Sequence, residues 1–145
     1  MQVIDAIGRR VDRARLSGLV ALGDIVLVGL FVVLGEISHG TPPWEFPVRT
    51  LEAFVPFLAG WVLAAFIGGL YTRDAWKSLR RAVSWTTPAW IMAVLIAMII
   101  RSMPFVRGGV QPTFVAVSIA VGLVLLVSWR TLIAVLYGDS LREET

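Results

Sequence analysis

The sequence predicts an all-α integral membrane protein, a four-transmembrane-helix up-down bundle preceded by a short amphipathic N-terminal helix. Of the 145 residues, 57% are hydrophobic and only 16% are charged, whereas a water-soluble domain carries about 25% charged residues. Four apolar stretches are long enough to cross about 30 Å of hydrocarbon at about 1.5 Å per residue. They lie near residues 17–37, 51–71, 83–103 and 113–137.

The chain is expected to begin with a basic arm, residues 1–15, ahead of the transmembrane domain, residues 16–137. Within the arm, Ile7, Val11 and Ala14 recur at helical spacing and the arginines fall elsewhere. This pattern has two interpretations: an amphipathic helix lying on the anionic inner face of the membrane, or a basic tail that only sets topology. The following apolar stretch is too long for a cleaved signal peptide and lacks a small-residue cleavage site.

Short links join the four predicted spans, and prolines in the first and third links mark turns. Short connections imply antiparallel neighbours in an up-down bundle. Aromatic residues near the span ends are expected to anchor at the interface or to pack; they are Trp44, Tyr71, Trp76, Trp85 and Trp90.

The placement of the cations predicts orientation. The N-terminal arm and the second link hold most of them, namely Arg9, Arg10, Arg13, Arg15, Arg73, Lys77, Arg80 and Arg81, while the first and third links hold only Arg49 and Arg107. Cations concentrate on the cytoplasmic side of a membrane. We therefore predict a multi-pass membrane protein with both termini and the tail, residues 138–145, in the cytoplasm.

Two charged residues lie inside the apolar spans at matching depth. Asp24 is seven residues from the inner limit of the first span at 17, and Arg130 is seven residues from the inner limit of the fourth at 137. A carboxylate inside an inserted helix costs about 2.5–3.5 kcal/mol and is rarely left without a partner. We therefore predict an Asp24–Arg130 ion pair, which requires the first and fourth spans to be neighbours. It either fixes helix order or serves as a proton site with Arg130 as a movable counter-ion.

A second polar cluster is predicted at the outer ends of the spans. Glu36 and Arg101 lie close to the outer limits of the first and third spans, with His39 and Glu52 near enough to join them. His39 is the only histidine in the chain. It is either a proton acceptor near the outer surface or a polar residue at a helix end.

Small residues recur every four positions in the second and fourth spans. The predicted helix-packing face comprises Pro56, Gly60, Ala64, Gly68, Ser118 and Gly122. Such faces let helix backbones approach closely in lipid, within one chain or between copies.

Several classes of chemistry are not expected. The chain has no cysteine, and one histidine cannot ligate a haem from both sides, so we expect neither a metal nor a cofactor. We find no phosphate-binding loop and no catalytic motif, which predicts that the protein is not an enzyme. A basic stripe on a polar surface is also missing, so nucleic-acid binding is not expected.

Several residues together resemble one known family. They are Gly23-Asp24, the run Phe31, Gly35 and His39-Gly40, the block from Pro56 to Trp61, then Arg101 and Trp129-Arg130. The sequence is similar to prokaryotic four-helix membrane proteins grouped as domain-of-unknown-function family 3054. This resemblance implies a four-helix integral membrane protein of the prokaryotic plasma membrane and no particular activity.

Three functions agree with these patterns. The first is a non-enzymatic binding or structural protein that contacts the lipid bilayer and self-associates, or serves as an accessory subunit of a membrane complex. The second is a homo-oligomeric transporter or channel that couples protons or ions through Asp24 and the outer cluster. The third is a protein that binds a hydrophobic ligand, such as a quinone, pigment or lipid, beside Phe57 and Trp61.

Overall fold

The computed structural model describes residues 2–71, 78–106 and 109–142, with the backbone alone for 3–16 and 138–142. In this part of the chain every regular element is a helix, as predicted. The helices are α1 (Gln2–Ser38), α2 (Pro47–Ile67), α3 (Leu79–Arg101) and α4 (Pro112–Arg142). Each contains a segment long and apolar enough to cross a membrane: Ser17–Ser38, Pro47–Ile67, Leu79–Arg101 and Pro112–Tyr137. The chain is therefore a multi-pass membrane protein.

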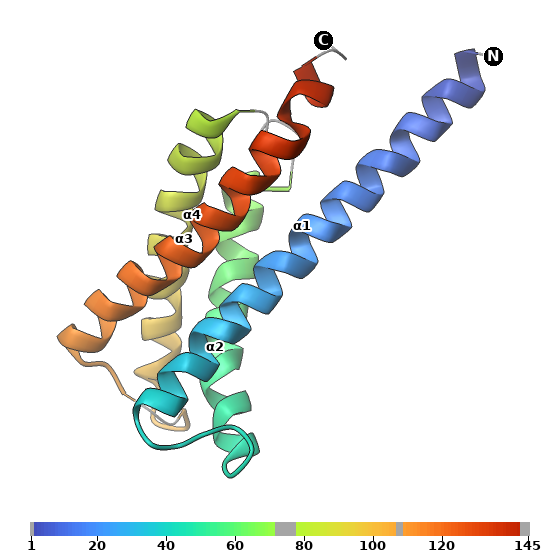
Figure 1. The fold of residues 1–145 in the computed structure, drawn as a ribbon. Helices are drawn as coiled ribbons and strands as arrows, with labels where there is room; N and C mark the ends of the chain where they lie inside the picture. The colour runs from blue at the N-terminus through green and yellow to red at the C-terminus, as the bar shows by residue number, and fades with distance from the viewer. Residues whose placement is uncertain (1, 72–77, 107–108, 143–145) are drawn as a thin grey trace.

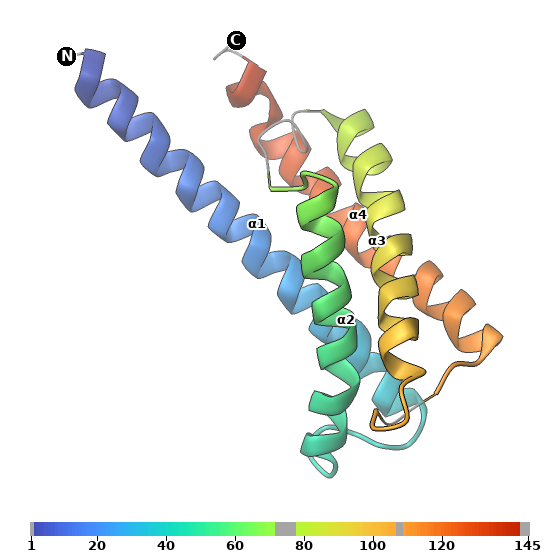
Figure 2. The same ribbon diagram turned by 180° about the vertical axis from the view of Figure 1, so that it is seen from behind.

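The four helices form two crossed layers (Figures 1 and 2). One layer contains α1 and α4, and the other contains α2 and α3. Helix α1 packs on both α2 and α4, and α3 also packs on both α2 and α4. The start of α1, the end of α2, the start of α3 and the end of α4 all lie at one end of the bundle. This arrangement confirms the up-down topology and makes the first and last spans neighbours, as the predicted ion pair requires.

The structure does not support a separate amphipathic helix at the N-terminus. Residues 2–15 continue into the first span without a break, so α1 is a single helix from Gln2 to Ser38. No proline interrupts this stretch, and nothing else there ends the backbone hydrogen-bond ladder. Helix α4 likewise continues beyond residue 137, through part of the predicted tail, to Arg142. Several residues used to predict orientation have side chains outside the described part, as does Trp76; the cations are Arg9, Arg10, Arg13, Arg15, Arg73, Lys77 and Arg107.

The second helix begins and ends four residues earlier than the predicted span of 51–71. Proline at its first turn starts α2, since a proline there gives up no needed hydrogen bond. At its end, Gly69 has a φ of +64°. The Leu70 N–H donates to the Ala65 carbonyl over 3.0 Å, and the Gly69 N–H to Phe66 over 3.3 Å. This Schellman motif reverses the chain and turns the buried Leu70 back into the bundle.

An aromatic cluster occupies the centre of the bundle. The ring centroids of Phe31 and Phe57 are 5.0 Å apart in an edge-to-face arrangement. Trp90 of α3 lies 5.7 Å from Phe31 and 6.2 Å from both Phe57 and Trp61. Phe114 adds α4 to this cluster, at 6.1 Å from Phe57. Rings from all four helices therefore pack together, and such pairs add about 0.5–1.5 kcal/mol each beyond the area they bury.

Small residues make the close helix contacts within this one chain. A Cβ on Gly60 would overlap the backbone carbonyl of Ala93, so α2 and α3 touch at this point. A Cβ on Gly122 would overlap the Trp90 ring. The other four residues of the predicted packing face differ in burial. Pro56, Ala64 and Ser118 are buried, whereas Gly68 is exposed at the end of α2. Most of the predicted face is therefore used inside the bundle, and Gly68 is not part of it.

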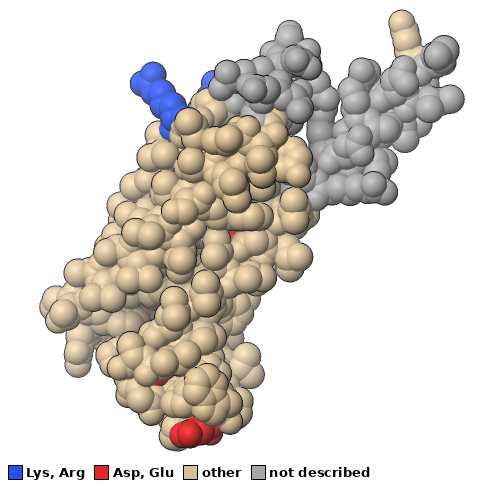
Figure 3. All heavy atoms as spheres, viewed as in Figure 1, with Lys and Arg blue, Asp and Glu red and all other residues tan. Residues whose placement is uncertain are grey.

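The outer surface of the bundle is largely uncharged. Figure 3 shows few charged atoms along the described flank on this face, with charged groups near its two ends. Many large apolar side chains point outward, including Leu22, Val26, Phe66 and Val124, which are 58–87% exposed. In a membrane these side chains contact lipid.

Candidate functional site

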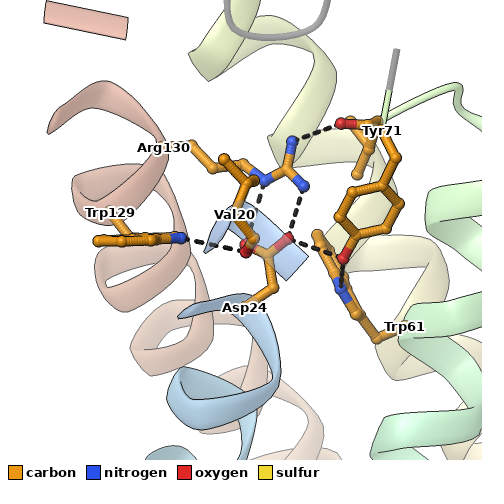
Figure 4. Close-up of polar contacts among 7 residues, drawn as sticks. Val20, Asp24, Trp61, Tyr71, Trp129 and Arg130 are labelled. Atoms are coloured by element: carbon orange, nitrogen blue, oxygen red, sulfur yellow. Dashed lines mark hydrogen bonds and ion pairs between the residues drawn. The ribbon is translucent and has the colours of Figure 1, made fainter. Parts of the chain in front are cut away.

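The site begins with two charged side chains from the first and last helices. Asp24 of α1 is 0% exposed and Arg130 of α4 is 1% exposed. Arg130 Nη2 donates to Asp24 Oδ2 over 2.6 Å, and Arg130 Nε donates to Oδ1 over 3.2 Å (Figure 4). The guanidinium thus donates to both carboxylate oxygens, and this bidentate geometry is the strongest for such a pair. The structure therefore brings together the two residues paired by depth in the sequence.

Three further residues complete this polar centre. The Tyr71 hydroxyl donates to Asp24 Oδ2 over 2.8 Å and accepts from Trp61 Nε1 over 3.0 Å. Arg130 Nη1 donates to the Leu70 carbonyl over 2.9 Å. The guanidinium also lies over the Trp61 and Tyr71 rings, with its central carbon 5.6 Å and 5.3 Å from their centroids. We call these five residues the inner centre.

The inner centre ties together three parts of the chain. Asp24 comes from α1, Arg130 from α4, and Trp61, Leu70 and Tyr71 from α2 and the turn that follows it. Beside it, α1 and α4 touch where the Trp129 ring lies against Gly23, and Trp129 Nε1 reaches the Val20 carbonyl at 3.5 Å. The contacts of the centre therefore join these parts of the chain, and each buried charge is both paired and hydrogen-bonded.

Tyr71 and Trp61 have different places in the structure from those that the sequence predicts. The sequence predicts Tyr71 at the membrane interface and Trp61 beside a ligand, whereas both belong to the inner centre. The signal for Tyr71 was present in the sequence as Gly68-Gly69 directly before Leu70, because a glycine pair at a helix end permits a reversal of the chain. Trp61 is 1% exposed and is covered by Tyr71 and Trp90.

The second predicted cluster forms only in part. Glu36 Oε2 lies 3.2 Å from Arg49 Nε and 2.7 Å from the Thr41 hydroxyl, so its ion-pair partner is Arg49 rather than Arg101. Arg49 follows the first link, which turns back at Gly40 (φ +76°) and brings the start of α2 beside the end of α1. The depth of each residue along its predicted span pairs Glu36 with Arg101, because a count of residues does not show where the chain reverses.

Arg101 lies near this pair with different partners. Its Nε donates to the Gly109 carbonyl over 3.2 Å, and its central guanidinium carbon lies 4.6 Å from the centroid of the Phe114 ring. His39 is exposed at the end of α1. Glu52 lines a smaller cavity of about 370 Å³ between α2 and the end of α3.

A larger cavity, of about 560 Å³, opens among the helix ends that lie opposite the start of α1 and the end of α4. We call it the outer cavity. Charged and polar residues line its outer part: Glu36, His39, Arg49, Arg101 and Gln111. Its inner part is lined by Phe31, Phe57 and Ser118. Phe57 thus lies on a cavity, as the ligand hypothesis expects, whereas Trp61 does not line it.

No group of three or more acidic, histidine or cysteine side chains in the described residues could hold a metal ion. The inner centre consists of one carboxylate, one guanidinium and their hydrogen-bond partners. This set can hold a fixed charge pair and stabilise the fold.

Comparison with known proteins identifies a family and nothing more. The family model described as "Protein of unknown function (DUF3054)" matches residues 21–133. No curated protein and no solved structure matches the chain. The matched segment includes both Asp24 and Arg130, and the chain belongs to this family, as the resemblance indicated.

Proposed function

We propose that this member of the DUF3054 family is a non-enzymatic binding or structural protein of the prokaryotic plasma membrane, with the inner centre acting as a structural clamp. The observation that supports the clamp is the complete pairing of Asp24 and Arg130 at 0% and 1% exposure. Both carboxylate oxygens accept from Arg130, and Oδ2 accepts a further bond from Tyr71.

A proton-coupled transporter fits this geometry less well. A coupling carboxylate has to gain and lose a proton and has to be reached from water on at least one side. Asp24 faces an arginine in direct contact, and neither the outer cavity nor the smaller cavity beside Glu52 includes Asp24 among its lining residues.

The lipid bilayer is the partner that the exposed apolar surface requires. Self-association, or docking onto a larger membrane complex, belongs to the same proposal. The buried small residues do not support it, because Gly60 and Gly122 pack against α3 of the same chain. A second copy would have to contact other residues.

Infrared difference spectroscopy tests the clamp. The protein is reconstituted in liposomes, and carboxyl bands are compared between wild type and Asp24→Asn across the range from about pH 5 to about pH 8. We expect no band from Asp24 to titrate in this range. A band that titrates near neutral pH and is absent from Asp24→Asn would contradict the clamp and favour proton coupling.

The proposed orientation places both termini in the cytoplasm. This orientation is supported by the distribution of arginines in the sequence. It is also supported by the start of α1 and the end of α4, which lie at the same end of the bundle. Since the chain has no cysteine, single cysteines report cleanly on sidedness. A membrane-impermeant maleimide should label Ser102→Cys in intact cells, and Leu79→Cys only after permeabilisation. The reverse pattern would overturn the orientation.

A further inference from the structure

The outer cavity has the polarity of an amphiphile-binding site. Three aromatic rings line it, those of Phe31, Phe57 and Phe114, and its charged groups lie toward the outer ends of the helices. Its volume of about 560 Å³ falls in the range of about 300–1,000 Å³ typical of small-molecule sites. A ligand with a polar head and an apolar body would match this arrangement.

The charges at the outer end favour an anionic head. Glu36 is compensated by Arg49 and also accepts from Thr41. Arg101 has a different environment: in the described part of the chain its guanidinium donates to a backbone carbonyl and stacks on Phe114, and the Glu36 carboxylate, paired with Arg49, attracts it only from beyond ion-pair distance. The cavity lining therefore carries one cation more than its carboxylate balances.

A buried hydroxyl lies at the inner end of the same cavity. Ser118 is 0% exposed and lines the cavity. Its Oγ has no hydrogen-bond partner among the described residues, although its carbonyl accepts from Trp90 Nε1 over 3.0 Å. A buried polar atom without a partner is uncommon and costly. Ser118 follows Phe114 by one turn of α4, which places it about 6 Å deeper along the helix axis than the ring on which Arg101 stacks.

We propose that the outer cavity binds an anionic amphiphile. A carboxylate or phosphate pairs with Arg101, the apolar body lies between Phe31, Phe57 and Phe114, and a second polar group one helical turn deeper bonds to the Ser118 hydroxyl. Arginine suits such a head because its planar fork recognises carboxylate and phosphate in the same way. This inference rests on the binding role proposed above and names the class of ligand.

Decanoate and decanol provide the first test, because they share a chain length and differ in charge. The full-length protein is placed in phosphatidylcholine nanodiscs, and binding is measured by titration calorimetry with empty nanodiscs subtracted. Decanoate should bind saturably and at least about tenfold tighter than decanol, since hydrogen bonds to charged groups dominate the difference. Equal affinity for the two probes in the unmodified protein would overturn the proposal without any need for a variant.

Two arginine variants on α3 form a matched pair for the same titration. Arg101→Gln should weaken decanoate binding about tenfold. Arg81→Gln should leave it unchanged, because Arg81 lies at the other end of the helix, over Trp85. Circular dichroism verifies that both variants fold. A folded Arg101→Gln protein that binds decanoate as wild type does would refute the role of Arg101.

The depth of the site is tested with 5-oxodecanoate, which carries a ketone about one helical turn from its carboxylate. The Ser118 hydroxyl should donate to this ketone. We expect 5-oxodecanoate to bind about two- to tenfold tighter than decanoate to wild type, the gain of one neutral hydrogen bond. This advantage should disappear in Ser118→Ala. If wild type shows no such advantage, the assignment of Ser118 is wrong.

Phosphatidylglycerol distinguishes the two sources of the anion. If a lipid phosphate occupies the site, adding this lipid to the nanodiscs should weaken decanoate binding to wild type but not to Arg101→Gln. If the ligand is a free carboxylate, decanoate affinity should not change. Failure of these titrations leaves the clamp at Asp24 untouched, because the infrared experiment concerns a different residue.

Discussion

Substitution of Asp24 by alanine should destabilise the bundle strongly. The change removes the acceptor of three hydrogen bonds, two from Arg130 and one from Tyr71. Arg130 would stay buried with only the Leu70 carbonyl as a hydrogen-bond partner. Breaking a buried pair in this way costs about 3–5 kcal/mol, because the remaining charge is uncompensated.

The assay is the free energy of unfolding in mixed micelles titrated with sodium dodecyl sulfate, followed by circular dichroism. Glu36→Ala provides the control, because it removes a carboxylate from an ion pair that is only partly buried: the Arg49 side chain is 47% exposed and that of Glu36 is 14% exposed. An ion pair open to water contributes about 0–1 kcal/mol. The two variants therefore compare a fully buried ion pair with a partly exposed one.

A double variant separates the pair from other effects of the substitution. Combining Asp24→Ala with Arg130→Met removes both charges and should recover most of the lost stability, since no unpaired charge remains. The reasoning fails if Asp24→Ala is as stable as Glu36→Ala. It also fails if the double variant loses the sum of the two single losses.

Three further predictions concern packing and the inner centre. Gly60→Ala should destabilise by about 1–3 kcal/mol, because its Cβ would overlap the Ala93 carbonyl; Gly18→Ala, with nothing within 4 Å of the added Cβ, should be neutral or stabilising in the same unfolding assay. Tyr71→Phe should cost about 1–3 kcal/mol, because the Asp24 carboxylate loses a buried donor, and a loss near zero would exclude Tyr71 from the clamp. Burial, together with the Asp24 carboxylate, raises the pKa of Tyr71 above its ordinary value of 10.0. The folded protein therefore favours the neutral hydroxyl. Above about pH 10, Tyr71 ionises in the unfolded chain before it does in the folded protein, so the free energy of unfolding should fall as the pH rises. This fall should be smaller in Tyr71→Phe.

Much of the fold follows from the sequence alone. Four apolar stretches separated by short polar links determine four helices and their antiparallel order, because lipid offers no partner for backbone polar groups outside a helix or a closed barrel. The pairing of Asp24 with Arg130 could also be predicted. A charge in an apolar helix has few available partners, and depth can be counted along the chain at about 1.5 Å per residue.

The tertiary structure decided the features that depend on where the chain reverses. The Schellman turn at Gly69 brings Tyr71 and the Leu70 carbonyl to the ion pair, although linear depth places Tyr71 at the surface. The turn at Gly40 brings Arg49 to Glu36 and leaves Arg101 on Phe114 beside the outer cavity. The depth of a residue within its span depends only on the number of residues from the end of the span, so it can be predicted from the sequence. The side chains that meet across a link depend on the direction in which the link folds, which the packing of all four helices determines together.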